Sequence, residues 1–136
     1  MAISISAIDQ KDYGNAYCLA TCYLAIAKSF GYNITMTTLK NEGIVASNGY
    51  VNSWGAYVAR GDSKTYNVAN IKAEIDAGKP CIITGQSSIG THYVVAYDYS
   101  GNTIKVMEPW GGTKVNIGDS TLTSTSSYRA CTKGTK

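Results

Sequence analysis

The chain of 136 residues carries 12 Lys and Arg against 9 Asp and Glu, which gives a net charge of +3. These charges are spread along the sequence without a basic cluster, which argues against a nucleic-acid binder, because such proteins gather cations against phosphates. Apolar residues make up 44% of the chain, but they are interrupted too evenly for a membrane span. A chain of this length buries roughly two thirds of its unfolded surface, so we expect one domain. It should cover residues 1–136.

The cysteine content and the first residues bear on the compartment. Four cysteines do not require a disulfide-stapled scaffold, and a bridge between Cys81 and Cys131 stays open. The start, MAISISAIDQKDYG, has no basic segment followed by an apolar one, so it does not resemble a signal peptide. The low charge and the many Ser, Thr and Gly residues favour a protein that acts outside the cytoplasm and reaches its target by another route.

Residues 17–32 predict a buried helix. From Cys18 onwards almost every side chain is apolar or small, and Gly31 stands where a helix ends. The turn and cap formers in residues 12–15 place Cys18 in or just before the first turn. Two shorter helices are predicted, over Met36–Asn41 and Val68–Ala77.

After Pro80 the pattern changes to short β-branched or aromatic segments that are separated by turn residues. This pattern is typical of antiparallel strands, and Ser100–Asn102 predicts a hairpin between the middle pair. Helices first and strands later indicate an α+β fold, with the long helix packed on the C-terminal sheet. The predicted strands are 81–85, 91–100, 102–109, 112–118 and a last one at 128–131.

Three residues of this pattern could perform nucleophilic catalysis. Cys18 opens the buried helix, where free N–H groups and the helix dipole favour a thiolate. His92 is the chain's one histidine and lies in a predicted strand. Glu108 lies near the end of the next strand, and the hairpin returns it beside His92, where a carboxylate can orient an imidazole. Asp98 and Asn102 are the alternatives for this third position.

The order of these elements resembles the papain-like cysteine peptidases. The elements are Gln10, Cys18 at the helix start, Gly90-Thr91-His92-Tyr93-Val94-Val95 on a strand, and Glu108-Pro109-Trp110-Gly111. They are most similar to the small bacterial enzymes related to the bacteriocin leader peptidases, which are double-glycine peptidases. The resemblance implies a papain-like fold with Cys18 as nucleophile, His92 as general base and then acid, and Glu108 as the group that orients the imidazole. It also implies that the Gln10 side chain binds the oxyanion together with the backbone N–H of Cys18.

Other interpretations of the same residues stay open. Cys22, one turn after Cys18, is a rival nucleophile, although it lacks the free N–H groups of a helix start. Leu19, Thr91 and Glu108 depart from the family pattern, which leaves room for a catalytically inactive binding module. A zinc site is a further alternative, although paired zinc cysteines normally come from turns. Its ligands would be Cys18, Cys22, Cys81, Cys131 and His92.

Several polar and aromatic residues are candidates for substrate binding. The small, polar loop 85–90 leads into His92 and could line a cleft, with Gln86, Ser87 and Ser88 against a substrate backbone. Trp110 follows Glu108 closely enough to shield the hydrogen bond between the histidine and the acid from water. Trp54, in the Asn-Ser-Trp-Gly string at 52–55, is a packing residue or part of the cleft.

We therefore expect a thiol hydrolase that cleaves peptide or amide bonds without a metal or organic cofactor. Bacterial cell-wall (peptidoglycan) peptides are the favoured substrate, and a leader or maturation peptidase that cuts after small residues is the alternative. Such an antibacterial enzyme would be secreted, released by a phage or injected, and a specific inhibitor or immunity protein is a possible partner. No nucleic-acid partner is expected.

Overall fold

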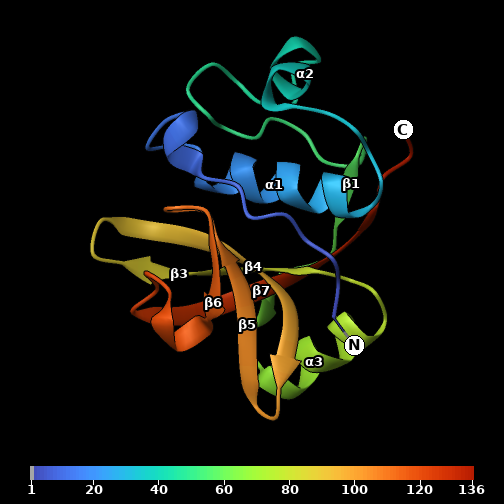
Figure 1. Ribbon diagram of the computed structural model, residues 1–136. Coiled ribbons are helices and arrows are strands. Elements are labelled where there is room, and N and C mark those ends of the chain that lie inside the picture. Colours follow the sequence, from blue (N-terminus) through green and yellow to red (C-terminus); the bar gives the residue numbers. More distant parts are fainter. Residues whose placement is uncertain (1) are drawn as a thin grey trace.

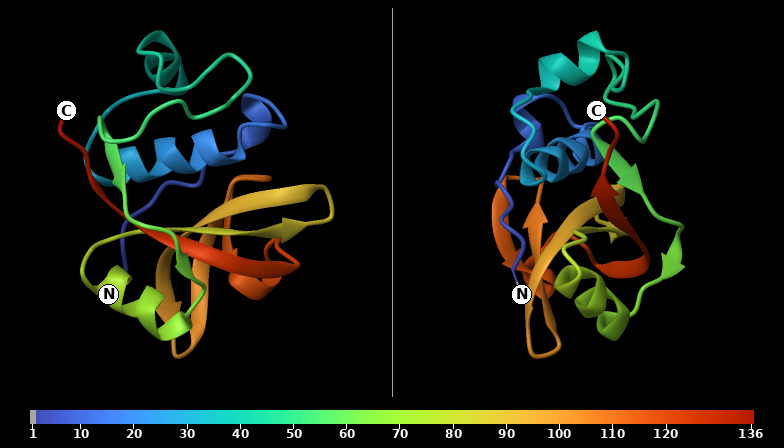
Figure 2. Two further views of the ribbon diagram at one scale, coloured as in Figure 1. Left: turned by 180° about the vertical axis from the view of Figure 1, so that it is seen from behind. Right: turned by 90° about the vertical axis from the view of Figure 1, so that its right-hand side faces the viewer.

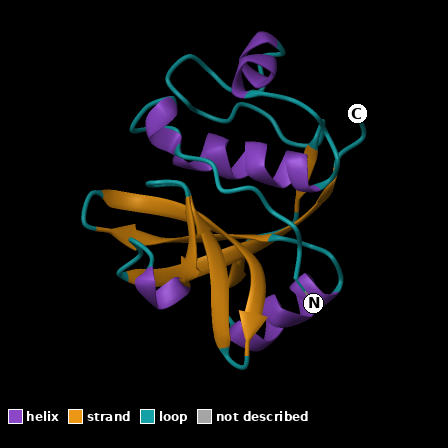
Figure 3. Ribbon diagram, in the orientation of Figure 1, coloured by secondary structure: helices purple, strands orange, loops and turns teal. Residues whose placement is uncertain are grey.

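The computed structural model describes residues 2–136 and shows a twisted antiparallel sheet with helices on both faces (Figure 1). Helices and strands segregate into layers, as the colouring by secondary structure shows (Figure 3). The predicted α+β, papain-like architecture is confirmed. The helices are α1 (Cys18–Ser29), α2 (Met36–Asn41) and α3 (Val68–Asp76), with short 3-10 helices η1 (Gln10–Asp12) and η2 (Ile117–Asp119).

Helix α1 forms one layer of the core because it is apolar around most of its circumference. Eight consecutive residues from Ala20 to Ala27 are buried, and they pack with sheet residues such as Ile82, Val95 and Met107. Helix α2 lies outside α1, farther from the sheet (Figure 2). It begins at a capping box between Thr35 and Thr38, as the polar residue before an apolar turn predicts.

Helix α3 covers the opposite face of the sheet. Asn67 caps it by accepting a hydrogen bond from the Asn70 N–H, and Ile71 and Ile75, one turn apart, are its buried residues. They pack against Val94, while the next residue of the same strand, Val95, faces α1. This alternation is the two-residue period expected of a strand that is covered on both faces.

Within residues 2–136, seven strands form one sheet in the order β1-β7-β3-β4-β5-β6, with β2 also paired to β7. All pairings are antiparallel, and the β4–β5 hairpin turns between Ser100 and Thr103, as predicted. No helix in this part of the chain has the length and apolarity to cross a membrane. The strands are β1 (Val58–Arg60), β2 (Lys64–Thr65), β3 (Cys81–Ser87), β4 (Gly90–Ser100), β5 (Thr103–Glu108), β6 (Thr113–Asn116) and β7 (Ser124–Lys133).

The structure departs from the predicted elements in the polar regions. The last strand, predicted at 128–131, begins at Ser124 and ends at Lys133. Backbone hydrogen bonds to β3 extend it over residues whose polar side chains do not indicate a strand. The segment 112–118 is a strand only to Asn116, and η2 follows it. The short strands β1 and β2 were not predicted, since two or three residues show no periodicity.

Candidate active site

Cys18 is the first residue of α1 and is partly exposed. The residue before it, Tyr17, occupies the N-cap position and makes no side-chain capping bond. The predicted place of Cys18 in the first turn is confirmed, and residues 12–15 form the predicted turn before the helix, where the Tyr13 and Gly14 N–H groups donate to the Gln10 carbonyl. None of these residues caps the helix, because the N-cap position belongs to Tyr17. The first-turn N–H groups of an uncapped helix are unsatisfied and favour negative charge beside them.

The β4–β5 hairpin brings His92 and Glu108 together across 16 residues of sequence. His92 Nε2 and Glu108 Oε2 are 2.6 Å apart, and each residue is only 3% exposed. The pairing of Val95 with Met107 places the end of β5 beside the first half of β4, as the predicted hairpin required. The alternative third residues lie elsewhere: Asn102 is in the hairpin turn, and its side chain accepts a hydrogen bond from Lys72.

Glu108 is held by donors beyond the histidine. The Trp110 N–H donates to Oε2 at 3.0 Å, and the Thr121 N–H and hydroxyl both donate to Oε1 at 2.8 Å. Burial alone would raise the pKa of this carboxyl, but the hydrogen bonds from His92, Thr121 and Trp110 outweigh burial and hold the pKa below its usual value. Glu108 is therefore a buried, charged acceptor with both oxygens occupied.

The His92 imidazole is poised to carry a proton. Burial favours its neutral form, but hydrogen bonds to Cys18 and Glu108 and the negative charges of both groups raise its pKa from 6.5 to about 9. Because Nε2 is engaged by Glu108, the other ring nitrogen, Nδ1, is the one left for Cys18. The structure thus pairs His92 with Glu108, and Cys18 acts on the same ring electrostatically.

Gln10 lies beside this group and is 1% exposed. Its backbone N–H donates to the Pro109 carbonyl at 2.9 Å, which ties η1 to the segment that follows Glu108. Its side-chain Nε2 donates to the Asn15 carbonyl at 3.0 Å, which leaves one amide hydrogen unused, and Oε1 has no partner among the described residues. The amide is thus anchored with a donor to spare.

A small cavity opens against His92. It is lined by Ser87, Ser88, Ile89, His92, Trp110 and Thr121. Trp110 is part of this lining, and its ring lies under the Lys11 ammonium at 4.7 Å. Gln86 lies outside this lining, because its side chain donates across the hairpin to the Thr91 hydroxyl at 3.2 Å.

Trp54 lies by a second cavity, which is also lined by Leu19 and Tyr93, the residues that follow Cys18 and His92. Its ring packs against Tyr23, with 5.1 Å between the centroids. Trp54 therefore packs against the core and also lines a cavity. Sequence reasoning did not identify Thr121 or Tyr93: a Thr in a polar tail carries no signal, and Tyr93 reads as an ordinary strand residue.

The other thiols are in different surroundings. Cys22 is fully buried, its thiol lies 3.6 Å from the Tyr93 carbonyl, and burial raises its pKa well above the usual value. Burial also raises the pKa of the Cys131 thiol to about 12. Cys81 and Cys131 are unbridged. Among residues 2–136, no three His, Cys, Asp or Glu side chains are grouped to hold a metal ion.

A partly exposed cysteine at a helix start and a buried histidine–carboxylate pair on an antiparallel sheet are the arrangement expected of a papain-like cysteine hydrolase. The model of the peptidase C39 family matches residues 5–125. The chain therefore belongs to this family of cysteine peptidases. No curated protein and no solved structure gives a significant match.

Proposed function

We propose that the chain hydrolyses peptide bonds with Cys18 as nucleophile, His92 as general base and acid, and Glu108 as the group that orients the imidazole. The observation that carries this proposal is the 2.6 Å contact between His92 and Glu108, on a ring whose pKa Cys18 also helps to raise. Cys22 is the weaker candidate, because a fully buried thiol that stays protonated is a poor nucleophile.

The chemistry begins with attack of the Cys18 sulfur on the substrate carbonyl carbon, while its proton resides on His92. The oxyanion that forms accepts hydrogen bonds from the Cys18 N–H and from the spare amide hydrogen of Gln10. The imidazolium then gives its proton to the leaving amine, and a thioester remains on Cys18. His92 next takes a proton from water, whose oxygen attacks the thioester, and the acid product leaves with the thiolate restored.

Peptidoglycan peptides are the proposed substrate within this reaction class. The net charge of +3 suits an enzyme that approaches an anionic polymer, and the low-charge surface suits work outside the cytoplasm. Trp110 and the serines of the His92 cavity would contact the peptide on the side of the imidazole. Cleavage of a leader peptide after small residues is the competing activity.

Two measurements test the proposal. Alkylation by iodoacetamide at neutral pH, followed by peptide mass mapping, should modify Cys18 far faster than Cys22, and Cys18→Ala should lose at least about 10⁴-fold of hydrolytic rate. Cys22→Ala is the matched control and should keep its activity. Loss of activity in Cys22→Ala with an active Cys18→Ala would reassign the nucleophile, and an unreactive Cys18 in an inactive protein would indicate a binding module.

Product masses identify the substrate. Purified cell wall should release peptides with new termini, whereas a synthetic peptide with a Gly-Gly site should stay intact. The reverse result would make the chain a leader peptidase and refute the cell-wall assignment.

A further inference from the structure

The cavity beside Trp54 is lined by two positively charged side chains. It measures about 250 Å³, and its lining includes Arg60 from β1 and Arg129 from β7. The antiparallel register pairs Arg60 with Cys131, two residues from Arg129 on the same strand. Cross-strand partners and residues two apart share a face, so both arginines project from one side of the sheet.

This cavity adjoins the proposed nucleophile. Leu19 and Tyr93, which follow Cys18 and His92 directly, form part of its wall. The Tyr93 phenol has a raised pKa, chiefly through burial; the Cys18 charge adds to the rise, and the Arg60 and Arg129 charges oppose it. Tyr93 therefore borders the same cavity as both arginines, one residue after His92.

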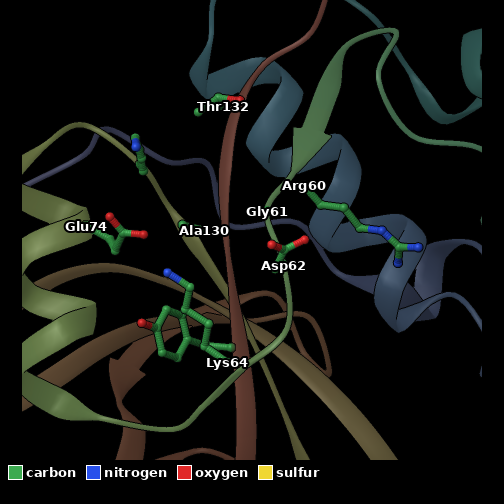
Figure 4. Close-up of a pocket in the computed structure, with 9 residues that line it drawn as sticks. Arg60, Gly61, Asp62, Lys64, Glu74, Ala130 and Thr132 are labelled. Carbon is green, nitrogen blue, oxygen red and sulfur yellow. The ribbon is translucent and has the colours of Figure 1, made fainter.

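No carboxylate of the described chain neutralises the two arginines. The Arg60 guanidinium lies over the Trp54 ring, 4.8 Å from its centroid, and Arg129 donates to the Gly61 carbonyl at 3.0 Å. Within residues 2–136 neither arginine forms an ion pair. Arg60 also lines a neighbouring pocket together with Asp62 and Glu74, but Figure 4 shows its side chain extending away from both carboxylates.

We propose that the cavity is a carboxylate-binding subsite, in which Arg60 and Arg129 hold an anionic group of the peptide substrate next to the scissile bond. A guanidinium presents several N–H donors in a plane, and such donors match the two oxygens of a carboxylate. Trp54 supports the Arg60 guanidinium from one face, which limits the entropy lost on binding. The proposal rests on the proposed function, and it names the feature that the substrate must carry.

The carboxylate has two possible sources, an acidic side chain or a free chain end. Digestion of a proteome-derived peptide library by the wild-type protein, read by mass spectrometry, should show cleavage sites enriched in one of them. For the best-cleaved peptide, replacing Glu by Gln or amidating the C-terminus then identifies which carboxylate is bound. We expect the matching change to lower kcat/KM at least about tenfold, the size of one charge-assisted hydrogen bond.

Variants assign the effect to the cavity. In Arg60→Gln and Arg129→Gln the discrimination between the charged and neutral peptide should fall to about twofold or less, because the carboxylate loses a guanidinium partner. Lys72→Gln is the matched control, because Lys72 also lies over an aromatic ring, Tyr99, but on α3 at the opposite face of the sheet. The control should discriminate like the wild type, and unchanged alkylation of Cys18 shows that each variant is folded.

The failures of the two proposals differ. Efficient cleavage by the wild type without preference for a carboxylate, or full preference retained in both arginine variants, would overturn the subsite and leave the peptidase function intact. A wild-type protein that cleaves nothing, with Cys18 no more reactive than a free thiol, would overturn the peptidase function and the subsite with it.

Discussion

Replacement of Glu108 by Gln tests how the imidazole is held. The carboxylate accepts four hydrogen bonds, from the His92 ring, the Trp110 N–H and two groups of Thr121. Gln can keep one oxygen towards Thr121, but its NH₂ group then faces His92 Nε2 and the Trp110 N–H. A donor at that position forces the ring proton onto Nδ1, the nitrogen that must accept the Cys18 proton.

The size of the effect follows from these contacts. A hydrogen bond to a charged group contributes about 1.5–3 kcal/mol, so the loss of charge beside the imidazolium alone costs roughly 10- to 100-fold in rate. The wrong ring tautomer adds to this loss, and we expect kcat/KM to fall by about 10² or more. His92→Ala should lose still more, because it removes the proton carrier itself.

The assay measures alkylation of Cys18 by iodoacetamide from pH 5 to 10, together with hydrolysis of the best peptide substrate. Glu74→Gln is the control, since Glu74 lies on α3 beyond the sheet. Glu108→Gln that keeps wild-type rates in both measurements would refute the role of the carboxylate. Glu108→Asp, with its shorter arm, should fall between the wild type and Glu108→Gln.

Three further predictions follow from the same contacts. The basic limb of kcat/KM against pH should lie near 9, the pKa of His92. In Glu108→Gln this limb should move to lower pH, because the Glu108 carboxylate helps to raise the pKa of His92. A limb that does not move would contradict this cause. The folded-state pKa of His92 is raised above its ordinary value of 6.5, so protonated His92 stabilises the folded state. This stabilisation is complete below pH 6.5 and is lost as the pH rises through about 9. Urea unfolding should therefore show the free energy of unfolding of the wild type falling by roughly 3 kcal/mol over this range relative to His92→Gln, and parallel curves would disprove it. Gly112→Ala should destabilise the fold by about 1–3 kcal/mol in thermal melts, because Gly112 has φ +65° and a Cβ there would lie 2.9 Å from the Asp9 nitrogen. Gly118→Ala is the control and should change little, since the space around Gly118 is open. Equal melting temperatures of the two variants would count against this reasoning.

The helices and the catalytic core could be predicted because their signals are local. An apolar run that begins at Cys18 and ends before Gly31 needs only its own residues to indicate a buried helix. The pairing of His92 with Glu108 spans 16 residues, yet one hairpin determines it, and the turn at Gly101 is visible in the sequence. Each of these steps uses a single element or a single turn.

The remainder of the site depends on contacts between distant strands. Thr121 completes the acid's hydrogen bonds from a loop whose polar residues look like any surface segment. Arg60 and Arg129 are separated by about half of the chain and line one cavity only because β1 pairs with β7, at the edge of the sheet. The short strand β1 has no periodicity to indicate that pairing.

The contrast between local elements and contacts of distant strands also distinguishes the proposed catalytic residues from the proposed specificity residues of this chain. The nucleophile and its partners need the fixed geometry of a helix start and a hairpin. Residues in such elements therefore occur in the sequence in a recognisable order, as a motif. The arginine-lined cavity needs only two cations on one face of the sheet, a condition that many pairs of strand positions satisfy. A change of substrate preference could therefore arise by substitutions at Arg60 or Arg129 that leave Cys18, His92 and Glu108 in place, and the activity of Arg60→Gln on a neutral peptide measures this independence directly.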